Sequence, residues 1–172
     1  MAYVPYVETC MRGGINVDYV ITNMNDDIVR EIISWRYEGN YAEYNMDSYE
    51  QLKERGSSIL KPEKSQNYLC YFNDNELVGY TNITKKPNGE LFLGIGLAPK
   101  YCGKGLGNSI LENSIEDAKN RYPGCKITLQ VRSWNERARK CYEKAGFKFI
   151  KKDTVEDHNG IETEFVFMEY VL

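Results

Sequence analysis

The sequence is poor in the residues that build metal sites. It has one histidine, His158, and its five cysteines are scattered without a Cys-x-x-Cys pair. Structural zinc sites use closely spaced Cys and His ligands, so we expect no metal cofactor. Scattered cysteines in odd number are economically explained as reduced thiols, and we therefore expect a cytoplasmic protein.

Long apolar runs and an excess of positive charge are also lacking. No stretch approaches the roughly 20 apolar residues of a membrane span, and Pro5 and Glu8 interrupt the opening segment, so we expect neither a membrane segment nor a signal peptide. The net charge of −3 argues against a partner that is a nucleic acid or a membrane surface. The 172 residues suffice for one domain with a substantial core. We expect this domain over residues 15–172, after a possible loose leader at residues 1–14.

The stretch from Leu91 to Arg121 organises the rest of the chain. Apolar residues alternate from Leu91, which predicts a strand that ends near Pro99. The glycine-rich loop Cys102-Gly103-Lys104-Gly105-Leu106-Gly107 follows, and apolar residues then recur at helical spacing as far as Ala118. A glycine turn at the start of a helix presents backbone N–H groups and the positive end of the helix dipole. This arrangement favours a bound phosphate or pyrophosphate.

Two nucleotide-binding loops are poor fits to this stretch. A P-loop requires a Gly separated by four residues from the Gly-Lys pair and a Ser or Thr after that pair, but the residues at these positions are Ala98 and Gly105. A dinucleotide fingerprint fails as well, because Asn108 and Pro99 stand where its last glycine is needed. A plain surface turn remains the alternative for the loop taken alone.

The loop resembles the acyl-CoA loop of the GNAT superfamily of N-acetyltransferases, Gln/Arg-x-x-Gly-x-Gly/Ala between a strand and a helix. Cys102 departs from the usual Arg or Gln, so the resemblance implies that cofactor affinity depends more on backbone donors and on Lys104. It implies acetyl-CoA as the co-substrate. The cofactor-binding residues that it implies in this region are Leu97, Ala98, Cys102, Gly103, Lys104, Gly105, Leu106, Gly107 and Asn108.

Periodicity and turn residues predict the other elements. Strands are predicted at residues 17–22, 68–72, 77–84, 127–131, 147–155 and 161–171, the last two joined by a turn at Asn159-Gly160. Helices are predicted after caps at Asn25 or Asp26, at Asp47 and at Asn135. From about residue 16 this order resembles the GNAT fold, a mixed α/β class. It implies a mostly antiparallel central sheet of six to seven strands flanked by about four helices.

A second motif lies downstream of the loop. The segment from Asn135 to Phe147 resembles the GNAT signature Asn-x-x-Ala-x-x-x-Tyr-x-x-x-Gly-Phe, with Ala138 and Tyr142 at the matching positions. In that signature the Asn and its helix contact the pantetheine arm, which implies cofactor contacts for Asn135 and Ala138. The Tyr lies near the acyl-CoA sulfur, where a phenol can protonate the departing thiolate. Judged without the motif, Asn135 is a helix N-cap and Tyr142 a half-buried aromatic.

The remaining chemistry requires an oxyanion donor, a base and an acceptor site. A backbone N–H near Leu97 is the donor that the resemblance implies. Glu90 is a candidate base, with a solvated carboxylate after the Asn88-Gly89 turn as its alternative. Cys102 is not expected to act as a nucleophile, because no histidine is placed to activate it. Four aromatic residues are candidate substrate-binding residues, with a second small core as the alternative: Trp35, Tyr37, Tyr41 and Tyr44.

These observations lead to one main hypothesis and two rivals. The first is direct transfer of the acetyl group of acetyl-CoA to a primary amine of a small molecule or protein, in a ternary complex with Tyr142 as general acid. A non-catalytic acyl-CoA-binding sensor or partner domain of the same fold is the second. A phosphate-binding nucleotide enzyme is the third and is disfavoured by both loop templates. A homodimer through the last strands is a further possibility.

Overall fold

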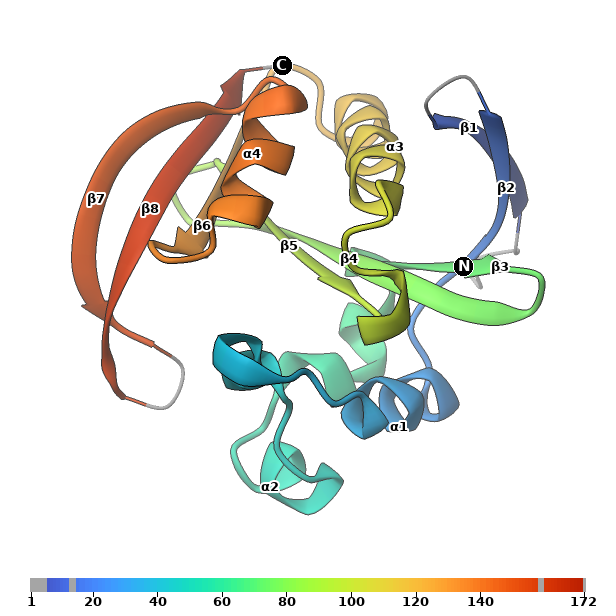
Figure 1. Ribbon diagram of the computed structural model, residues 1–172, viewed down its shortest axis with the longest axis horizontal. Helices are drawn as coiled ribbons and strands as arrows, with labels where there is room; N and C mark the ends of the chain where they lie inside the picture. Colours follow the sequence, from blue (N-terminus) through green and yellow to red (C-terminus); the bar gives the residue numbers. More distant parts are fainter. Residues whose placement is uncertain (1–5, 13–14, 158–159, 172) are drawn as a thin grey trace. The chain divides into compact units, whose positions relative to one another are not determined.

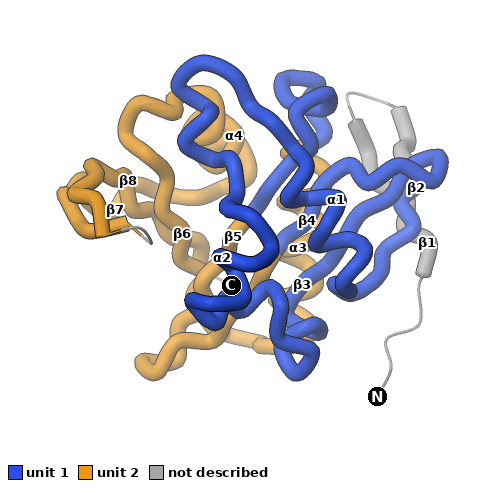
Figure 2. Tube along the Cα trace, turned by 90° about the horizontal axis from the view of Figure 1, so that it is seen from below, with its two compact units in different colours: residues 1–81, 95–106 blue, residues 82–94, 107–172 orange. Residues whose placement is uncertain are grey.

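The computed structural model (Figure 1) describes residues 6–12, 15–157 and 160–171. The chain divides into two units, which Figure 2 shows in different colours: unit 1 is Met1–Thr81 with Ile95–Leu106, and unit 2 is Asn82–Gly94 with Gly107–Leu172. Two strands, β4 (Glu76–Lys85) and β5 (Leu91–Leu97), contribute residues to both units. The eight described strands hydrogen-bond in the order β1-β2-β3-β4-β5-β6-β8-β7.

Unit 1 begins with an antiparallel pair of strands, β1 (Tyr6–Arg12) and β2 (Ile15–Thr22). Strand β3 (Tyr68–Asn73) pairs antiparallel with β2, with Val20 opposite Phe72 and Thr22 opposite Cys70. The turn from β3 to β4 passes through Asp74 and Asn75, both in the left-handed conformation that short polar side chains tolerate. The last part of β5 belongs to this unit and carries Leu97 at its end.

Side-chain caps start the α-helices of unit 1. The side chain of Asn25 accepts a hydrogen bond from the Ile28 N–H and starts α1 (Asp26–Ser34), as predicted. Ser48, not the predicted Asp47, caps α2 (Tyr49–Glu54), because its hydroxyl and Gln51 form a reciprocal capping box. Short 3₁₀ helices complete the unit: η1 (Gly39–Tyr44), η2 (Ser58–Leu60), η3 (Pro62–Asn67) and η4 (Pro99–Tyr101).

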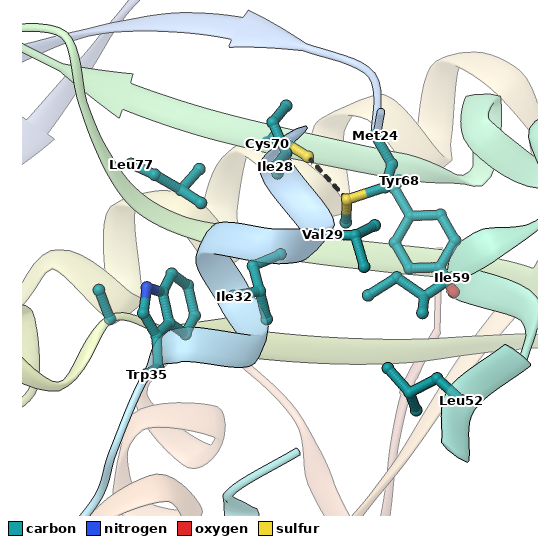
Figure 3. Packing of buried hydrophobic residues seen from close by; sticks show 11 residues of the cluster. Met24, Ile28, Val29, Ile32, Trp35, Leu52, Ile59, Tyr68, Cys70 and Leu77 are labelled. Carbon is teal, nitrogen blue, oxygen red and sulfur yellow. Dashed lines mark hydrogen bonds between the residues drawn. The ribbon is translucent and has the colours of Figure 1, made fainter. Parts of the chain in front are cut away.

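The core of unit 1 lies between α1 and the strands β3 and β4, as Figure 3 shows. Ile28, Val29 and Ile32 repeat at helical spacing on the buried face of α1. Within this core the Cys70 thiol approaches the Met24 sulfur at 3.9 Å (Figure 3). Apolar burial of this kind contributes about 1.5–3 kcal/mol per large side chain and is the main source of the unit's stability.

Unit 2 contains the remaining strands and the helices of the two motifs. Its elements are α3 (Leu106–Arg121, with Leu106 in unit 1), β6 (Lys126–Arg132), α4 (Glu136–Lys144), β7 (Lys148–Glu156) and β8 (Glu162–Val171). Strand β6 runs parallel to β5, with Leu91 opposite Ile127, and antiparallel to β8. Strands β7 and β8 pair antiparallel and curve together (Figure 1). Ile110, Leu111 and Met168 are fully buried in this unit.

The mixed α/β class and the mostly antiparallel sheet expected from the sequence are confirmed. Two details differ. Strand β1 lies inside residues 1–14, where a loose leader was expected, and its ladder to β2 runs from Tyr6 opposite Ile21 to Arg12 opposite Ile15. Half of the expected turn between β7 and β8, Asn159, lies outside the described residues. Within the described part of the chain, no helix combines the length and the apolar character that crossing a membrane requires.

Candidate active site

The glycine loop connects β5 to α3 through a fixed backbone path. The 3₁₀ helix η4 ends at Tyr101, and α3 begins at Leu106. Between them Gly103 and Gly105 have φ angles of +74° and +79°, values that only glycine adopts without strain. A Cβ added at Gly103 would meet no atom within 4 Å, so the space beside the loop is open. The first N–H groups of an α-helix have no partner inside the helix, and here they follow this loop directly.

Side chains on either side of the loop fasten it within unit 1. The Cys102 thiol points back to the carbonyl oxygens of Leu97 and Ala98, at 3.8 and 3.7 Å. Glu76, at the start of β4, accepts hydrogen bonds from Lys100 (2.7 Å) and from the Tyr101 hydroxyl. Hydrogen bonds from Lys100 and Tyr101 hold the pKa of the Glu76 carboxyl below its usual value. Cys102, which stands where the resembling family usually has Arg or Gln, thus takes part in the local structure of the loop.

Lys104 lies at the outer part of this loop. Its ammonium group is 5.7 Å from the centre of the Tyr101 ring, within the range of a cation–π contact. The side chain is exposed, so its ammonium can also turn toward an anion at the loop. Unit 1 therefore places the loop glycines beside an exposed lysine, a combination that suits an anion.

The four aromatic residues predicted for the acceptor divide into two groups. Trp35 is 9% exposed and belongs to the core of unit 1, as the alternative of a small core expects. Tyr41 is half-buried and Tyr44 is 37% exposed, and their ring centres are 6.4 Å apart. Tyr37 contacts the more exposed group, because its ring centre is 6.5 Å from that of Tyr44. Its hydroxyl donates a hydrogen bond to the Leu97 carbonyl oxygen at 2.7 Å. The structure therefore joins one predicted substrate residue to one predicted cofactor residue.

Tyr80 and Gly96 are two residues of this region that the sequence analysis missed. A Cβ at Gly96 would lie 2.6 Å from a ring carbon of Tyr80, so only glycine fits there. The Tyr80 ring also lies 6.1 Å from that of Trp35 and 6.4 Å from that of Tyr68, and burial raises its pKa. The sequence signal for this contact was Gly96 itself, because a glycine inside a predicted strand often marks the close approach of another group.

The second motif lies in unit 2 and starts α4. The buried side chain of Asn135 accepts a hydrogen bond from the Ala138 N–H at 3.1 Å, so it is the N-cap of the helix. The Cys141 thiol donates to the Asn108 side-chain oxygen at 2.8 Å and ties α4 to α3. Burial raises the pKa of Cys141, which keeps this thiol protonated and able to donate. Two predicted cofactor residues, Asn135 and Asn108, are thus held by contacts to the same helix.

Tyr142 is 9% exposed and is fixed by aromatic contacts. Its ring lies edge-to-face against Phe147 at 6.1 Å, and Phe147 lies 5.6 Å from Tyr170 on β8. Gly146 has a φ angle of +100°, and a Cβ there would come within 3.0 Å of the Tyr170 ring. The Gly-Phe pair at the end of the motif therefore has a physical role: it places Phe147 where it supports the tyrosine.

Glu90 lies at the opposite end of β5 from Leu97 and has several partners. Its carboxylate accepts from the Asn88 side chain at 3.0 Å, and its N–H donates to the Asn88 side-chain oxygen at 3.1 Å. The ammonium nitrogen of Lys126 lies 3.9 Å from a carboxylate oxygen of Glu90 and 2.8 Å from a carboxylate oxygen of Glu169. These contacts support the alternative of a surface carboxylate, and a role as base is left as a proposal.

Among the described residues, no cluster of three or more His, Cys, Asp or Glu side chains is arranged to hold a metal ion. The single histidine, His158, lies outside the described residues. The candidate chemistry of this part of the chain therefore consists of backbone donors, one lysine, carboxylates and tyrosine hydroxyls. Such groups suit anion binding and proton transfer.

A mixed α/β fold with a strand, a glycine loop and a helix in this order is typical of proteins that bind a phosphate-bearing cofactor at the start of the helix. Residues 27–147 match the family model described as the acetyltransferase (GNAT) family. The chain belongs to this family. Its members use acetyl-CoA and transfer acetyl groups to amine acceptors, so the resemblance stated from the two motifs is confirmed.

Individual relatives are similar to this chain at low sequence identity. An N-alpha-acetyltransferase of Saccharolobus solfataricus is 29% identical over 141 residues, which cover 78% of this chain and 83% of that protein. A spermidine N-acetyltransferase chimera from Vibrio cholerae and hSSAT has a similar structure, with 19% identity, a TM-score of 0.71, and coverage of 89% of this chain and 95% of that chain. A putative acetyltransferase from Salmonella typhimurium with its cofactor acetyl-CoA has 15% identity, a TM-score of 0.62, and coverage of 90% and 94%. At these identities the two solved structures support the fold alone.

Proposed function

We propose that the protein is an N-acetyltransferase that transfers the acetyl group of acetyl-CoA directly to a primary amine in a ternary complex. The observation that carries this proposal is the pair of left-handed glycines, Gly103 and Gly105, between β5 and α3 in a chain of the GNAT family. The two glycines allow a tight turn at the start of α3, where unpaired backbone N–H groups of the helix would bind a pyrophosphate.

The residues of this chain fit acetyl-CoA. The backbone from Gly103 to Asn108, together with Lys104, would hold the pyrophosphate, and Cys102, Leu97 and Ala98 would shape the approach to it. Asn135 and Ala138 would contact the pantetheine arm, as the signature implies. When bound, acetyl-CoA supplies an activated thioester. The open space beside Gly103 is the structural feature that supports this fit.

The proposed reaction assigns two polar groups to the thioester. As the family resemblance implies, the backbone N–H of Leu97 would donate to the carbonyl oxygen on which negative charge develops. The signature likewise implies that Tyr142 would protonate the sulfur as the C–S bond breaks and the amine nitrogen forms its bond to the acetyl carbon. The buried ring of Tyr142, held by Phe147, supports this role because a fixed acid needs no reorientation.

Direct transfer is favoured over an acetyl-cysteine intermediate. The Cys102 thiol points to two backbone carbonyls, and the described residues provide no histidine that could deprotonate it. The amine itself must lose a proton before it attacks. Glu90 is proposed as the base and, because it lies at the opposite end of β5 from Leu97, it would take this proton through a chain of water molecules.

The acceptor is proposed to be a small-molecule amine or a protein amino group. The relatives bear on both, since one is named as an N-alpha-acetyltransferase and another as a spermidine N-acetyltransferase. Tyr37, Tyr41 and Tyr44 would provide aromatic faces for a cationic amine. Trp35, being buried, would act by supporting this segment.

A second candidate is an acyl-CoA-binding sensor or partner domain without turnover. The engaged carboxylate of Glu90 and the loss of the usual Arg or Gln at Cys102 favour it. In either case a homodimer through the last strands is a proposal: β7 is the last strand of the sheet, and all its residues except Val155 are exposed. Light scattering after size-exclusion chromatography measures this directly.

The first experiment is a thermal-shift titration with acetyl-CoA, CoA and ATP. A ligand at one hundred times its Kd adds about 2.7 kcal/mol of stability, enough to raise the melting temperature by several degrees. A shift with acetyl-CoA but not with ATP, followed by CoA release in the presence of peptide amines or polyamines, supports the enzyme. Binding without release for any amine supports the sensor. No shift with either CoA species would remove the cofactor assignment.

A further inference from the structure

Tyr37 follows α1, and one side chain holds its backbone. The Tyr37 N–H donates to the Asn45 side-chain oxygen at 2.7 Å, and the Asn45 side-chain nitrogen donates to the Tyr37 carbonyl at 3.3 Å. These two bonds close residues 37–45 into a loop that contains η1. The Tyr37 ring also packs against the core of unit 1. Contacts within residues 37–45 and with the core of unit 1 therefore fix the direction of the Tyr37 side chain.

The hydroxyl of Tyr37 ends on the last residue of β5. It donates to the Leu97 carbonyl oxygen at 2.7 Å, the usual distance for a bond between a hydroxyl and a carbonyl. The Cys102 thiol approaches the same oxygen at 3.8 Å and is the weaker of the two donors. A carbonyl oxygen has two lone pairs and can accept both. The carbonyl is thus held from two sides by residues of the same unit.

The orientation of this carbonyl also sets the orientation of the Leu97 N–H. The Ala98 N–H donates to the Val78 carbonyl at 2.9 Å and so points toward β4. Across the planar trans peptide bond the Leu97 carbonyl must point the opposite way, away from β4. In an extended residue of an antiparallel strand, the N–H and the carbonyl point to the same side. The Leu97 N–H therefore points away from β4, on the side from which the Tyr37 hydroxyl approaches.

We infer that Tyr37 is a positioning residue for acetyl transfer: its hydroxyl holds the Leu97 carbonyl and thereby fixes the direction of the Leu97 N–H. The inference rests on the proposed function, in which that N–H polarises the carbonyl of the acyl group. A donor that already points at the developing charge stabilises the transition state without reorganisation. Tyr37 thus affects the chemical step through Leu97, in addition to any contact that its ring makes with the acceptor.

Tyr37→Phe tests this inference because it removes only the hydroxyl. We expect kcat to fall by about fivefold to tenfold, the effect of losing one neutral hydrogen bond at the chemical step, while the KM values for acetyl-CoA and the amine stay within about twofold. Tyr49→Phe is the matched control. It removes a hydroxyl that donates to Asp26 in the same unit, and it should leave kcat unchanged.

A spectroscopic measurement reports on the same contact without turnover. The amide nitrogen after a carbonyl responds to hydrogen bonds that the carbonyl accepts, so the ¹⁵N resonance of Ala98 should move in Tyr37→Phe and stay in place in Tyr49→Phe. An unchanged kcat, a rise in the KM for the amine alone, or an equal loss in both variants would overturn the inference while the enzyme stands. A wild-type protein that acetylates no amine would instead overturn the proposed function and the inference with it.

Discussion

Arg132 and Asp157 form a buried ion pair in unit 2, with a guanidinium nitrogen 3.0 Å from a carboxylate oxygen. Their side chains are 10% and 4% exposed. Arg132 also donates to the Thr163 hydroxyl at 3.2 Å, and Asp157 accepts from the Ile161 N–H at 3.1 Å. The pair therefore fastens the end of β6 to the connection between β7 and β8.

Breaking this pair from one side should be costly. Asp157→Asn keeps the shape but removes the charge, which leaves a buried guanidinium without its counter-ion. We expect the free energy of unfolding, measured by urea denaturation, to fall by about 3 kcal/mol. Asp153→Asn is the matched control, since its pair with Lys151 is exposed to solvent and should contribute little to stability. Equal losses in the two variants would show that burial does not distinguish the pairs.

Tyr142→Phe separates the chemistry of the hydroxyl from the packing of the ring. The contact between the ring and Phe147 is kept, so we expect an unchanged melting temperature and nearly unchanged CoA affinity. Transfer should slow by at least about tenfold, because a positioned acid contributes roughly 10²–10⁴-fold. Tyr170→Phe, in the same row of rings, is the control and should keep full activity. Equal rates for Tyr142→Phe and wild type would exclude Tyr142 as the acid.

Gly105→Glu tests the anion-binding loop by calorimetric titration with CoA. A carboxylate at this position would oppose the pyrophosphate, and we expect CoA binding to be lost. A side chain at a φ angle of +79° is also strained, so a control with the same strain is needed. Gly124→Glu provides it: its φ angle is +76°, and an added Cβ meets no atom within 4 Å. CoA affinity retained in Gly105→Glu would contradict the loop assignment.

The buried thiol of Cys70 should make stability depend on alkaline pH. Burial raises its pKa to about 12, whereas the unfolded chain has a thiol pKa of about 8.5. Between these values the unfolded chain loses the proton and the folded protein keeps it. The contribution of Cys70 is therefore complete below about pH 8.5 and is lost as the pH rises toward 12, at up to about 1.4 kcal/mol per pH unit.

Cys70→Ala removes this titration. We expect the difference in free energy of unfolding between wild type and Cys70→Ala to shrink as the pH rises from 8 to 10, measured by urea denaturation at each pH. The variant itself loses some stability at every pH, because the thiol packs beside Met24 in the core (Figure 3). A difference that is independent of pH would show that the thiol titrates alike in both states.

Local interactions made the elements predictable from the sequence. Asn25 and Asn135 cap the helices that follow them because the cap and the bonded N–H are only three residues apart. The choice of Asp47 over Ser48 as a cap was wrong for a local reason too, since Ser48 alone has Gln51 at the position that completes a capping box. Strand β1 was missed because no residue pattern in that segment indicated its pairing with β2.

The sequence by itself determined the class of this protein: two motifs, in order and at the right spacing, are properties of neighbouring residues. Only the tertiary structure decided the partners of the site residues. Tyr37 and Leu97 are 60 positions apart, and nothing near either residue announces their hydrogen bond. Likewise, Lys126 reaches Glu90 only because β6 lies beside β5. Local patterns fix backbone conformation, whereas contacts over long separations depend on which elements finally pack together.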